Sequence, residues 1–465
     1  MSTLPVFELP EPPAALALDE AAASEPWQLD VVAIVARFRA RQLSPRELLE
    51  AYLARIERYE PLVQGWVSLD VERARAAARE AEQRWQKACA AEPPPLCGVP
   101  VGIKDVIWTR DLVTKAGSPL YQDFRPPSDA AAVAALREAG AIILGKTTTT
   151  EFAYGDPPPT RNPWNLGHTP GGSSSGSAAC LAARMVPLAL GTQTVGSIIR
   201  PAAYCGVCGL MPRQALISLN GVFPVSPTLD HVGPMGLSVR DLRYVLSVLA
   251  SGGESTRYRP LPGVRGLRAG LPDRHFDRNL DPEVARALDE ARRTLEELGV
   301  SFRSVSLPDS FEAAEATRAT IIDAEAATYH DRHLREAPDR IGPELRRKLE
   351  QGRQALAIEY LKALEVQDRY RAEMRALFEQ VDLLFLPATP TPAPAGLAWT
   401  GDRVFIGPLT HADLPTLTFP VGHSRSGLPI GLQLAAPDEA TVLAVGEAYQ
   451  AMTDWHRQAP ALDRA

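Results

Sequence analysis

Apolar positions near the start of the chain recur at the spacing of a helix. In residues 43–61, Ser44 is a suitable N-cap, Pro45 fits the first turn and Glu47 completes a capping box. One face of this segment is apolar and consists of Leu48, Leu49, Tyr52, Leu53 and Ile56. The pattern predicts an amphipathic helix, and the Ala-, Glu- and Arg-rich residues 70–90 predict a second one.

From residue 98 onward, short apolar runs rich in β-branched residues alternate with amphipathic segments. Strands are predicted within 98–107, 141–146, 301–307, 381–394 and 427–437, and helices within 129–140, 281–298, 310–380 and 439–453. This alternation is typical of α/β proteins. The prediction is a single α/β/α sandwich, in which helices flank a large mixed β-sheet. We assign residues 26–465 to this domain and interpret the Pro- and Ala-rich residues 1–25 as an N-terminal extension.

Composition and charge narrow the classes of function. The chain has 465 residues, 45% of them hydrophobic, and a formal net charge of −7. This acidity is unfavourable for nucleic acid or an anionic membrane as the main partner. No apolar run approaches the roughly 20 residues that span a bilayer, and the first residues lack the features of a secretory signal. A cytoplasmic protein without a nucleic-acid or membrane partner is expected.

The cysteines and histidines give little sign of metal chemistry. Cys205 and Cys208 have C-x-x-C spacing, yet no second such pair or nearby pair of histidines completes a zinc site. We interpret them as small packing residues with reduced thiols. His330 and His333 share one face of a predicted helix without a third ligand, and we expect them at the surface. Neither a metal nor a cofactor is predicted.

Two short motifs resemble known active-site loops. Residues 140–147 fit the phosphate-binding pattern G-x-x-x-x-G-K-[ST], but a helix precedes them and their middle residues favour a strand, so nucleotide binding is not expected. Residues 172–176 fit the G-x-S-x-G turn of serine hydrolases, although the residues before them are typical of a loop rather than the required strand. A serine hydrolase with Ser174 as nucleophile and His411 or His423 as base is an alternative.

A lysine and a serine have surroundings that suit catalysis. Lys104 lies in an apolar run that we predict to be a buried strand, in a chain with only six lysines. Burial lowers the pKa of a lysine and favours the neutral amine, which can accept a proton from a hydroxyl. Ser197 lies in the run GTQTVGSIIRPAA, whose small residues let several backbone N–H groups face one oxygen atom.

Several longer motifs follow one another along the chain. GVPVGIKD begins at Gly98, GAIILGKT at Gly140, PGGSSSGSAA at Pro170 and GTQTVGSIIRPAA at Gly191. SPTLDHVGPM, DLLFLPATPTPAP and GLPIGLQL come after them. In this combination, over about residues 30–455, the chain resembles the amidase signature family.

The resemblance implies a Ser–Ser–Lys catalytic set. Ser197 matches the family nucleophile, Ser173 the bridging serine preceded by a cis peptide bond, and Lys104 the base. It also implies an oxyanion hole formed by the backbone N–H groups of Thr194, Val195, Gly196 and Ser197. The chain is then expected to be an amidase that cleaves the C–N bond of a small carboxamide, anilide or carbamate through an acyl-enzyme on Ser197, without a metal or cofactor. By analogy, the helical segment of about residues 310–380 covers the acyl pocket, and the chain forms a homodimer.

The motifs depart from the commonest strings of that family at several positions. The differing residues are Ser175 and Val195 in place of glycine, Gln193 in place of aspartate and Ile199 in place of arginine. Arg200 is a candidate to substitute in part for the missing arginine. These differences count against the transamidosome subunit that makes Gln-tRNA. Such a subunit, or a catalytically weak scaffold with the same fold, is a further alternative.

Overall fold

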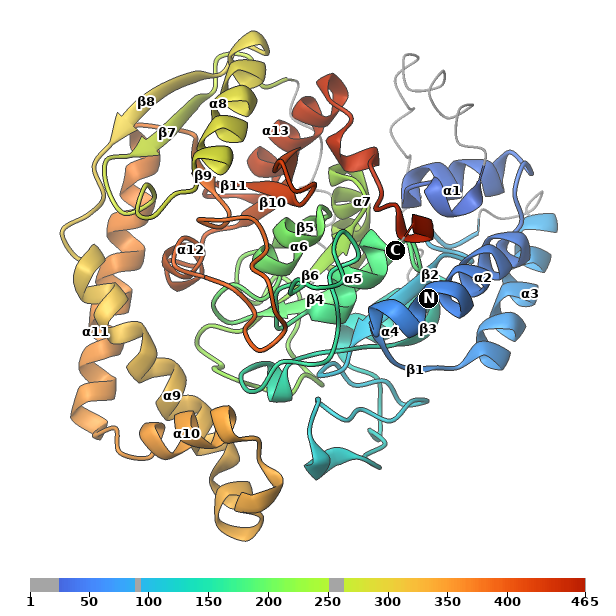
Figure 1. Cartoon of the computed structure of the whole chain (residues 1–465), viewed down its shortest axis with the longest axis horizontal. Coiled ribbons are helices and arrows are strands. Elements are labelled where there is room, and N and C mark those ends of the chain that lie inside the picture. The colour runs from blue at the N-terminus through green and yellow to red at the C-terminus, as the bar shows by residue number, and fades with distance from the viewer. Residues whose placement is uncertain (1–24, 88–92, 251–262, 465) are drawn as a thin grey trace, which may run out of the picture.

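A large mixed sheet forms the centre of the molecule (Figure 1). The computed structural model describes residues 25–87, 93–250 and 263–464, so the predicted extension of residues 1–25 lies almost wholly outside the described residues. Within these ranges eleven strands are hydrogen-bonded in the order β1-β3-β2-β4-β6-β5-β10-β11-β9-β7-β8. The strands are β1 (Trp66–Leu69), β2 (Pro100–Lys104), β3 (Ile142–Thr147), β4 (Leu188–Gln193), β5 (Cys208–Met211), β6 (His231–Gly236), β7 (Arg268–Pro272), β8 (Ser301–Val305), β9 (Leu383–Pro387), β10 (Thr416–His423) and β11 (Pro429–Ala435).

Parallel and antiparallel pairs are combined in this sheet. Strand β2 runs parallel to both β3 and β4, and β7 runs parallel to both β8 and β9. The pairs between β4 and β11, along the sheet order, are antiparallel. The parallel pair of β2 and β4 places the ends of both strands at the same edge, so Lys104 at the end of β2 and the chain that leaves β4 meet there.

Helices cover both faces of the sheet. They are α1 (Val31–Arg39), α2 (Pro45–Val63), α3 (Val71–Gln86), α4 (Ala131–Glu138), α5 (Ser175–Ala182), α6 (Ile199–Cys205), α7 (Val239–Leu249), α8 (Pro282–Glu297), α9 (Phe311–Glu336), α10 (Pro343–Gly352), α11 (Ala357–Ala376), α12 (Gly407–His411) and α13 (Glu439–Met452). Short 3-10 turns connect several of them.

The central strands are apolar on both sides, which explains the two layers of helices. Along β4, Leu188 and Leu190 pack into one cluster of buried side chains and Ala189 packs into another. Because successive side chains of a strand point to opposite faces, the two clusters lie on opposite sides of the sheet. Helices α4, α7 and α13 contribute to the first cluster, and α5 and α6 contribute to the second. The predicted α/β/α sandwich with a large mixed sheet is confirmed.

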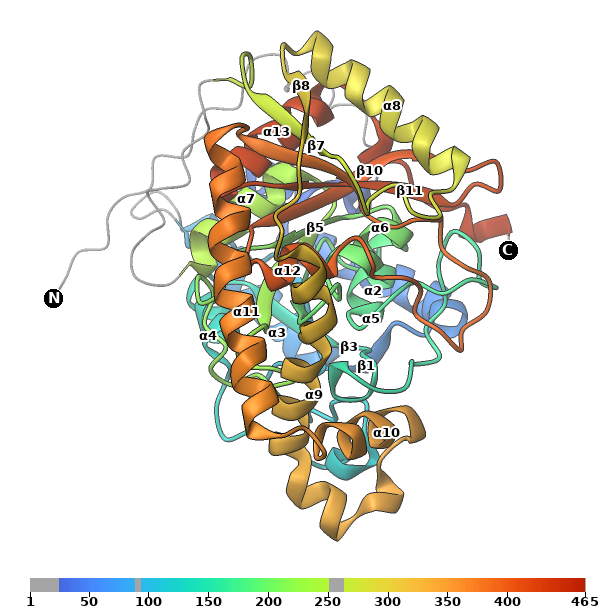
Figure 2. The same cartoon turned by 90° about the vertical axis from the view of Figure 1, so that its left-hand side faces the viewer.

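The segment predicted as helical at about residues 310–380 contains α9, α10 and α11. Helix α9 contacts both of the others. Figures 1 and 2 both show α9 and α11 side by side, with α10 at the end that lies away from the sheet. We call these three helices the helical arm.

Local sequence signals located the start of α2 but not every element boundary. Ser44 and Glu47 form the predicted capping box at the start of α2, since each side chain accepts a hydrogen bond from the other residue's backbone N–H. Helix α3 ends at Gln86, before the predicted limit, and residues 88–90 of that prediction lie outside the described residues. Helix α1 was not predicted, because its sequence VVAIVARFR begins as an almost continuous apolar run without clear periodicity.

Candidate active site

Lys104 brings an amine into the apolar interior. It is the last residue of β2 and is fully buried. Its Nζ lies 2.7 Å from the Ser173 Oγ, and it donates hydrogen bonds to the Thr192 Oγ1 at 2.7 Å and the Thr192 carbonyl oxygen at 3.2 Å. Burial holds the pKa of Lys104 well below its usual range; Asp230 opposes this effect and Arg200 adds to it. The site therefore favours a neutral amine.

Ser173 lies in the turn that leads into α5. The peptide bond between Gly172 and Ser173 is cis, as the sequence resemblance implied. The next residue, Ser174, donates its backbone N–H to the carbonyl oxygen of Ser197 at 3.2 Å. This hydrogen bond joins the two serine-bearing segments, which are 24 residues apart in the sequence.

Ser197 lies in the turn between β4 and α6 and is 9% exposed. Among the described residues, no hydrogen bond joins its hydroxyl to that of Ser173 or to the amine of Lys104. The backbone N–H groups of residues 194–197 likewise have no hydrogen-bond partner within the described ranges. The turn thus presents one slightly exposed hydroxyl and four unused backbone donors.

The side chain of Gln193 stabilises this turn through hydrogen bonds. Its Oε1 accepts hydrogen bonds from the backbone N–H groups of Ile198 at 2.8 Å and Ile199 at 3.1 Å, and its Nε2 donates to the Thr410 Oγ1 at 2.9 Å. A neutral amide is therefore well suited to this position. Arg200 is not paired with Gln193; its guanidinium instead donates to the backbone carbonyl oxygens of Gly172 and Gly401. Arg200 therefore does not replace the missing arginine through a contact with the residue at position 193.

Asp230 is a buried carboxylate close to the same turn. It accepts a hydrogen bond from the Thr194 Oγ1 at 2.6 Å and two more from the backbone N–H groups of Val225 and Ser226. Burial raises the pKa of Asp230 to about 6, although these hydrogen bonds oppose the increase. Asp230 therefore fixes the orientation of Thr194 and, when ionised, favours the charged form of Lys104.

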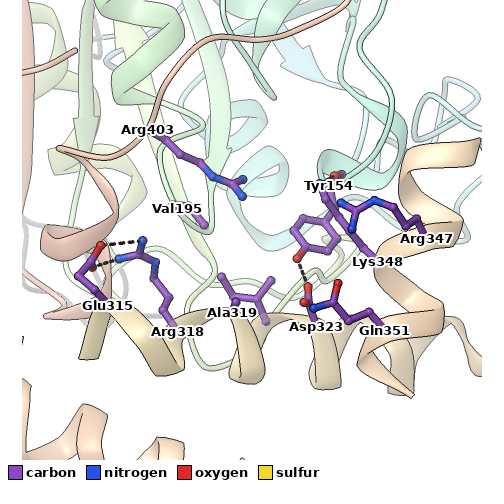
Figure 3. A pocket seen from close by; sticks show the side chains of 11 residues that line it. Tyr154, Val195, Glu315, Arg318, Ala319, Asp323, Arg347, Lys348, Gln351 and Arg403 are labelled. Carbon is purple, nitrogen blue, oxygen red and sulfur yellow. Dashed lines mark hydrogen bonds and ion pairs between the residues drawn. The ribbon is translucent and has the colours of Figure 1, made fainter. Parts of the chain in front are cut away.

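A cavity of about 240 Å³ opens beside Val195. One wall comes from the helical arm, where α9 supplies Arg318 and Asp323 and α10 supplies Lys348, and Arg403 projects from the opposite side (Figure 3). Val195 is 4% exposed, and its carbonyl oxygen accepts a hydrogen bond from the Thr410 hydroxyl. Its side chain lines the cavity, and its N–H has no hydrogen-bond partner within the described ranges.

The structure does not bring together the alternative serine hydrolase site. Ser174 is fully buried, and its hydroxyl donates to the carbonyl oxygen of Thr192 and accepts from the N–H of the same residue, both at 3.3 Å. His411 is buried with both ring nitrogens unpartnered, and the His423 ring lies against Trp164. Within the described ranges, no histidine is hydrogen-bonded to Ser174.

The lysine of the phosphate-binding motif is also buried in the core. Lys146 is fully buried on β3, where its Nζ donates to the carbonyl oxygen of Ile107 and to the Thr114 Oγ1 at 3.1 Å and lies 3.7 Å from the Asp105 carboxylate. Its amine therefore satisfies internal partners instead of facing a nucleotide.

The cysteine prediction agrees with the structure, but one histidine prediction was wrong. Cys205 and Cys208 are free and buried. His330 is not a surface residue: it is 2% exposed and packs against the ring of Phe152, while His333 is partly buried beside it. No group of three or more metal-ligating side chains is found in the described part of the chain, and none of its helices is both long and apolar enough to cross a membrane.

Several site residues were not identified from the sequence. Thr192 lies in the GTQT motif, so its closeness to Ser197 was a usable signal. Asp230 and Arg403 reach the site only through contacts between distant segments. Asp230 lies in the SPTLDHVGPM motif, which marked the segment but not this contact, and nothing in the sequence around Arg403 indicates its place.

A family model and the curated relatives agree on the family to which this chain is similar. The amidase family matches residues 47–443. The chain is 38% identical over 470 residues to a subunit of the glutamyl-tRNA(Gln) amidotransferase of Roseiflexus sp. (strain RS-1), covering 90% of this chain and 96% of the relative. It is 37% identical to the subunit of the same name from Geobacter metallireducens (strain ATCC 53774 / DSM 7210 / GS-15), covering 91% and 96%.

Solved structures share the fold over nearly the full length. One belongs to a vestigial protein complex described as revealing the evolutionary origins of an s-triazine catabolic enzyme; it has a TM-score of 0.84 and 32% identity, covering 91% of this chain and 98% of that one. A 6-aminohexanoate cyclic dimer hydrolase with its substrate has a TM-score of 0.83 and 26% identity, covering 94% and 99%. From the match over most of its length and the identity to curated relatives, the chain belongs to the amidase signature family.

Proposed function

We propose that this enzyme hydrolyses the C–N bond of a small carboxamide, anilide or carbamate through an acyl-enzyme on Ser197. The observation that carries the proposal is the contact of 2.7 Å between the buried Lys104 amine and the Ser173 hydroxyl. A neutral amine inside an apolar interior is a proton acceptor, and an adjacent hydroxyl is a suitable relay to a nucleophile.

The first step is acylation. The two oxygens of Thr192 accept both N–H bonds of the neutral amine, so its lone pair is left for the Ser173 hydroxyl. In the proposal, the Ser197 hydroxyl hydrogen-bonds Ser173 when substrate is bound. Its proton passes to Ser173 as that serine gives its own proton to Lys104. The Ser197 Oγ then bonds to the substrate carbonyl carbon.

The unused backbone donors of residues 194–197 suit the negative oxygen of the tetrahedral intermediate. When the intermediate collapses, the C–N bond breaks and the proton held by Lys104 returns through Ser173 to the leaving nitrogen. Water then attacks the ester on Ser197 by the same proton path and releases the acid. All of these steps use groups of the protein and water.

A small substrate agrees with the size of the cavity beside Val195. At about 240 Å³ the cavity is slightly smaller than typical pockets for drug-sized ligands. The helical arm is proposed to cover the acyl group of the substrate, because α9 and α10 supply most of the cavity wall.

A fluorophosphonate probe, which forms a covalent bond with activated serine hydroxyls, tests the nucleophile. Labelling of the wild-type protein is expected, and Ser197→Ala should abolish it. Ser424→Ala removes a serine on the loop after β10 that hydrogen-bonds to Ser426 and does not line the cavity, and it should label normally. Labelling that persists in Ser197→Ala would redirect attention to Ser174. Absence of labelling and turnover in the wild type would favour a scaffold without catalysis.

A second candidate is a transamidosome-type subunit. It is favoured by the curated relatives, which are named as subunits of glutamyl-tRNA(Gln) amidotransferase and align over more than nine-tenths of their length. The test is conversion of glutamyl-tRNA(Gln) to glutaminyl-tRNA(Gln), by the chain alone and after recombination with proteins that co-purify with it. Conversion would establish this candidate. Anilide hydrolysis by the isolated chain without conversion would favour the independent amidase.

A further inference from the structure

The cavity beside Val195 is lined by more cations than anions. Arg318, Arg347, Lys348 and Arg403 are the cations, and Glu315 and Asp323 are the carboxylates. Such an excess matters for recognition only where a charge lacks a partner in the protein, because paired charges have little left to offer a ligand.

Three of the four cations are already paired. Arg318 forms an ion pair with Glu315 on the same helix. On α10, Arg347 and Lys348 both pair with Glu344, at 3.0 and 3.3 Å. The Lys348 amine also donates to the backbone carbonyl oxygen of Tyr154 at 2.7 Å.

The two carboxylates of the cavity are also engaged. Glu315 is held by Arg318 as described, and the Tyr154 hydroxyl donates to the Asp323 carboxylate (Figure 3). Burial raises the pKa of Asp323, whereas the hydrogen bond from Tyr154 and the nearby charge of Arg403 oppose the increase. Neither carboxylate forms an ion pair with Arg403.

Arg403 is therefore the cation of this cavity with unused donors. It is exposed, and its side chain has no hydrogen bond or ion pair with any residue that the structure describes. Figure 3 shows it projecting toward the space between Val195 and Tyr154. A guanidinium offers a planar set of N–H donors that matches the two oxygens of a carboxylate.

Arg403 also lies beside the turn that carries Ser197. A Cβ added to Gly196 would be only 3.3 Å from the Cβ of Arg403, so Arg403 starts in contact with the residue before Ser197. Val195, two residues before Ser197, lines the same cavity as Arg403.

We infer that Arg403 is a specificity-determining residue that binds a carboxylate on the acyl part of the substrate. This inference rests on the proposed function and narrows it to acidic amides, those whose acyl chain ends in a carboxylate. The charge of Arg403 would favour such substrates over neutral ones of the same shape.

A matched pair of anilides tests the inference. Succinic mono-4-nitroanilide carries the carboxylate, butyric 4-nitroanilide is its neutral counterpart, and both release 4-nitroaniline. The wild type should have a kcat/KM about 10-fold or more higher for the succinic compound. Arg403→Gln should remove that advantage by lowering kcat/KM for the succinic compound much more than for the butyric compound, and Arg403→Lys should restore part of it.

Arg346→Gln is the matched control. Arg346 is on α10 but pairs with Glu350 and does not line the cavity. Arg346→Gln removes one positive charge, as Arg403→Gln does, and should leave the preference for the succinic compound intact. Equal kcat/KM values for the two anilides in the wild type, or an equal loss for both in Arg403→Gln, would overturn the inference.

A binding measurement distinguishes failure of this inference from failure of the proposed reaction. Calorimetric titration of the Ser197→Ala protein with each anilide measures recognition without turnover. Tighter binding of the succinic compound that disappears when Arg403→Gln is added supports the inference, even if the wild type hydrolyses neither anilide and the proposed function fails. Equal affinity for both compounds contradicts it, whatever the hydrolysis rates are.

Discussion

Replacing Thr192 with valine tests how the amine of Lys104 is oriented. Thr192 accepts hydrogen bonds from this amine through both its Oγ1 and its carbonyl oxygen. Valine keeps the β-branched shape and the carbonyl group and removes only the Oγ1. The neutral amine then has one fixed N–H instead of two, so its lone pair is no longer held toward Ser173.

Two effects of Thr192→Val can be estimated. Losing one hydrogen bond that positions the neutral amine costs about 1 kcal/mol, or about a fivefold fall in kcat/KM where Lys104 is unprotonated. The ammonium form loses a stronger, charge-assisted bond, by about another 1 kcal/mol. Because the protonated form is destabilised more, the pKa of Lys104 falls further. The acid limb of the pH profile should therefore move to lower pH, by less than about one unit.

The measurement is kcat/KM for an aryl anilide across the acid and neutral pH range. Thr418→Val is the matched control, since Thr418 is a buried strand residue whose hydroxyl donates to the Leu432 carbonyl oxygen at 2.7 Å. It should lower the free energy of unfolding without moving the pH profile. An unchanged rate in Thr192→Val, or an acid limb displaced to higher pH, would refute the proposed orientation of the amine.

Three further substitutions extend the test. Lys104→Ala should cut turnover by about 10²- to 10⁴-fold, with the alkaline end of the pH profile least affected, and an unaltered profile would count against a lysine base. Gly176→Ala places a Cβ 2.2 Å from a backbone oxygen and should lower the free energy of unfolding in urea by about 1–3 kcal/mol or more, whereas Gly196→Ala, with its nearest contact at 3.3 Å, should lower it by less. Lys146→Met leaves the buried Asp105 unpaired and should cost about 3–5 kcal/mol in thermal or urea unfolding, part of which Asp105→Asn added to it should recover; equal stability would contradict the buried pair.

Features set by short stretches of chain were predictable. The apolar run around Lys104 predicted a buried strand, and the capping residues of α2 located its first turn. The motif around Ser173 and Ser197 indicated which hydroxyls to consider, and the structure joins their two segments through a backbone hydrogen bond. Their catalytic roles remain predictions.

Features that depend on distant contacts were not predictable from local pattern. His330 is buried because α9 packs its ring against Phe152, more than 170 residues earlier in the chain. The periodicity of a helix does not show which distant segment covers a given face. Asp230 contacts Thr194, which lies 36 residues earlier in the chain, and Arg403 reaches the cavity from a loop before α12. In each case the partner is fixed by the tertiary fold.

The wall that α9 and α10 contribute to the cavity is separate in sequence from the strand ends and turns that carry Lys104, Ser173 and Ser197. Mutations in the arm can therefore remodel what the pocket admits while the bond-breaking groups stay intact. A family built in this way can diversify its substrates by drift in one segment. For the engineer, libraries confined to the cavity-lining positions of α9 and α10 offer a route to new selectivities that leaves Lys104, Ser173 and Ser197 unchanged.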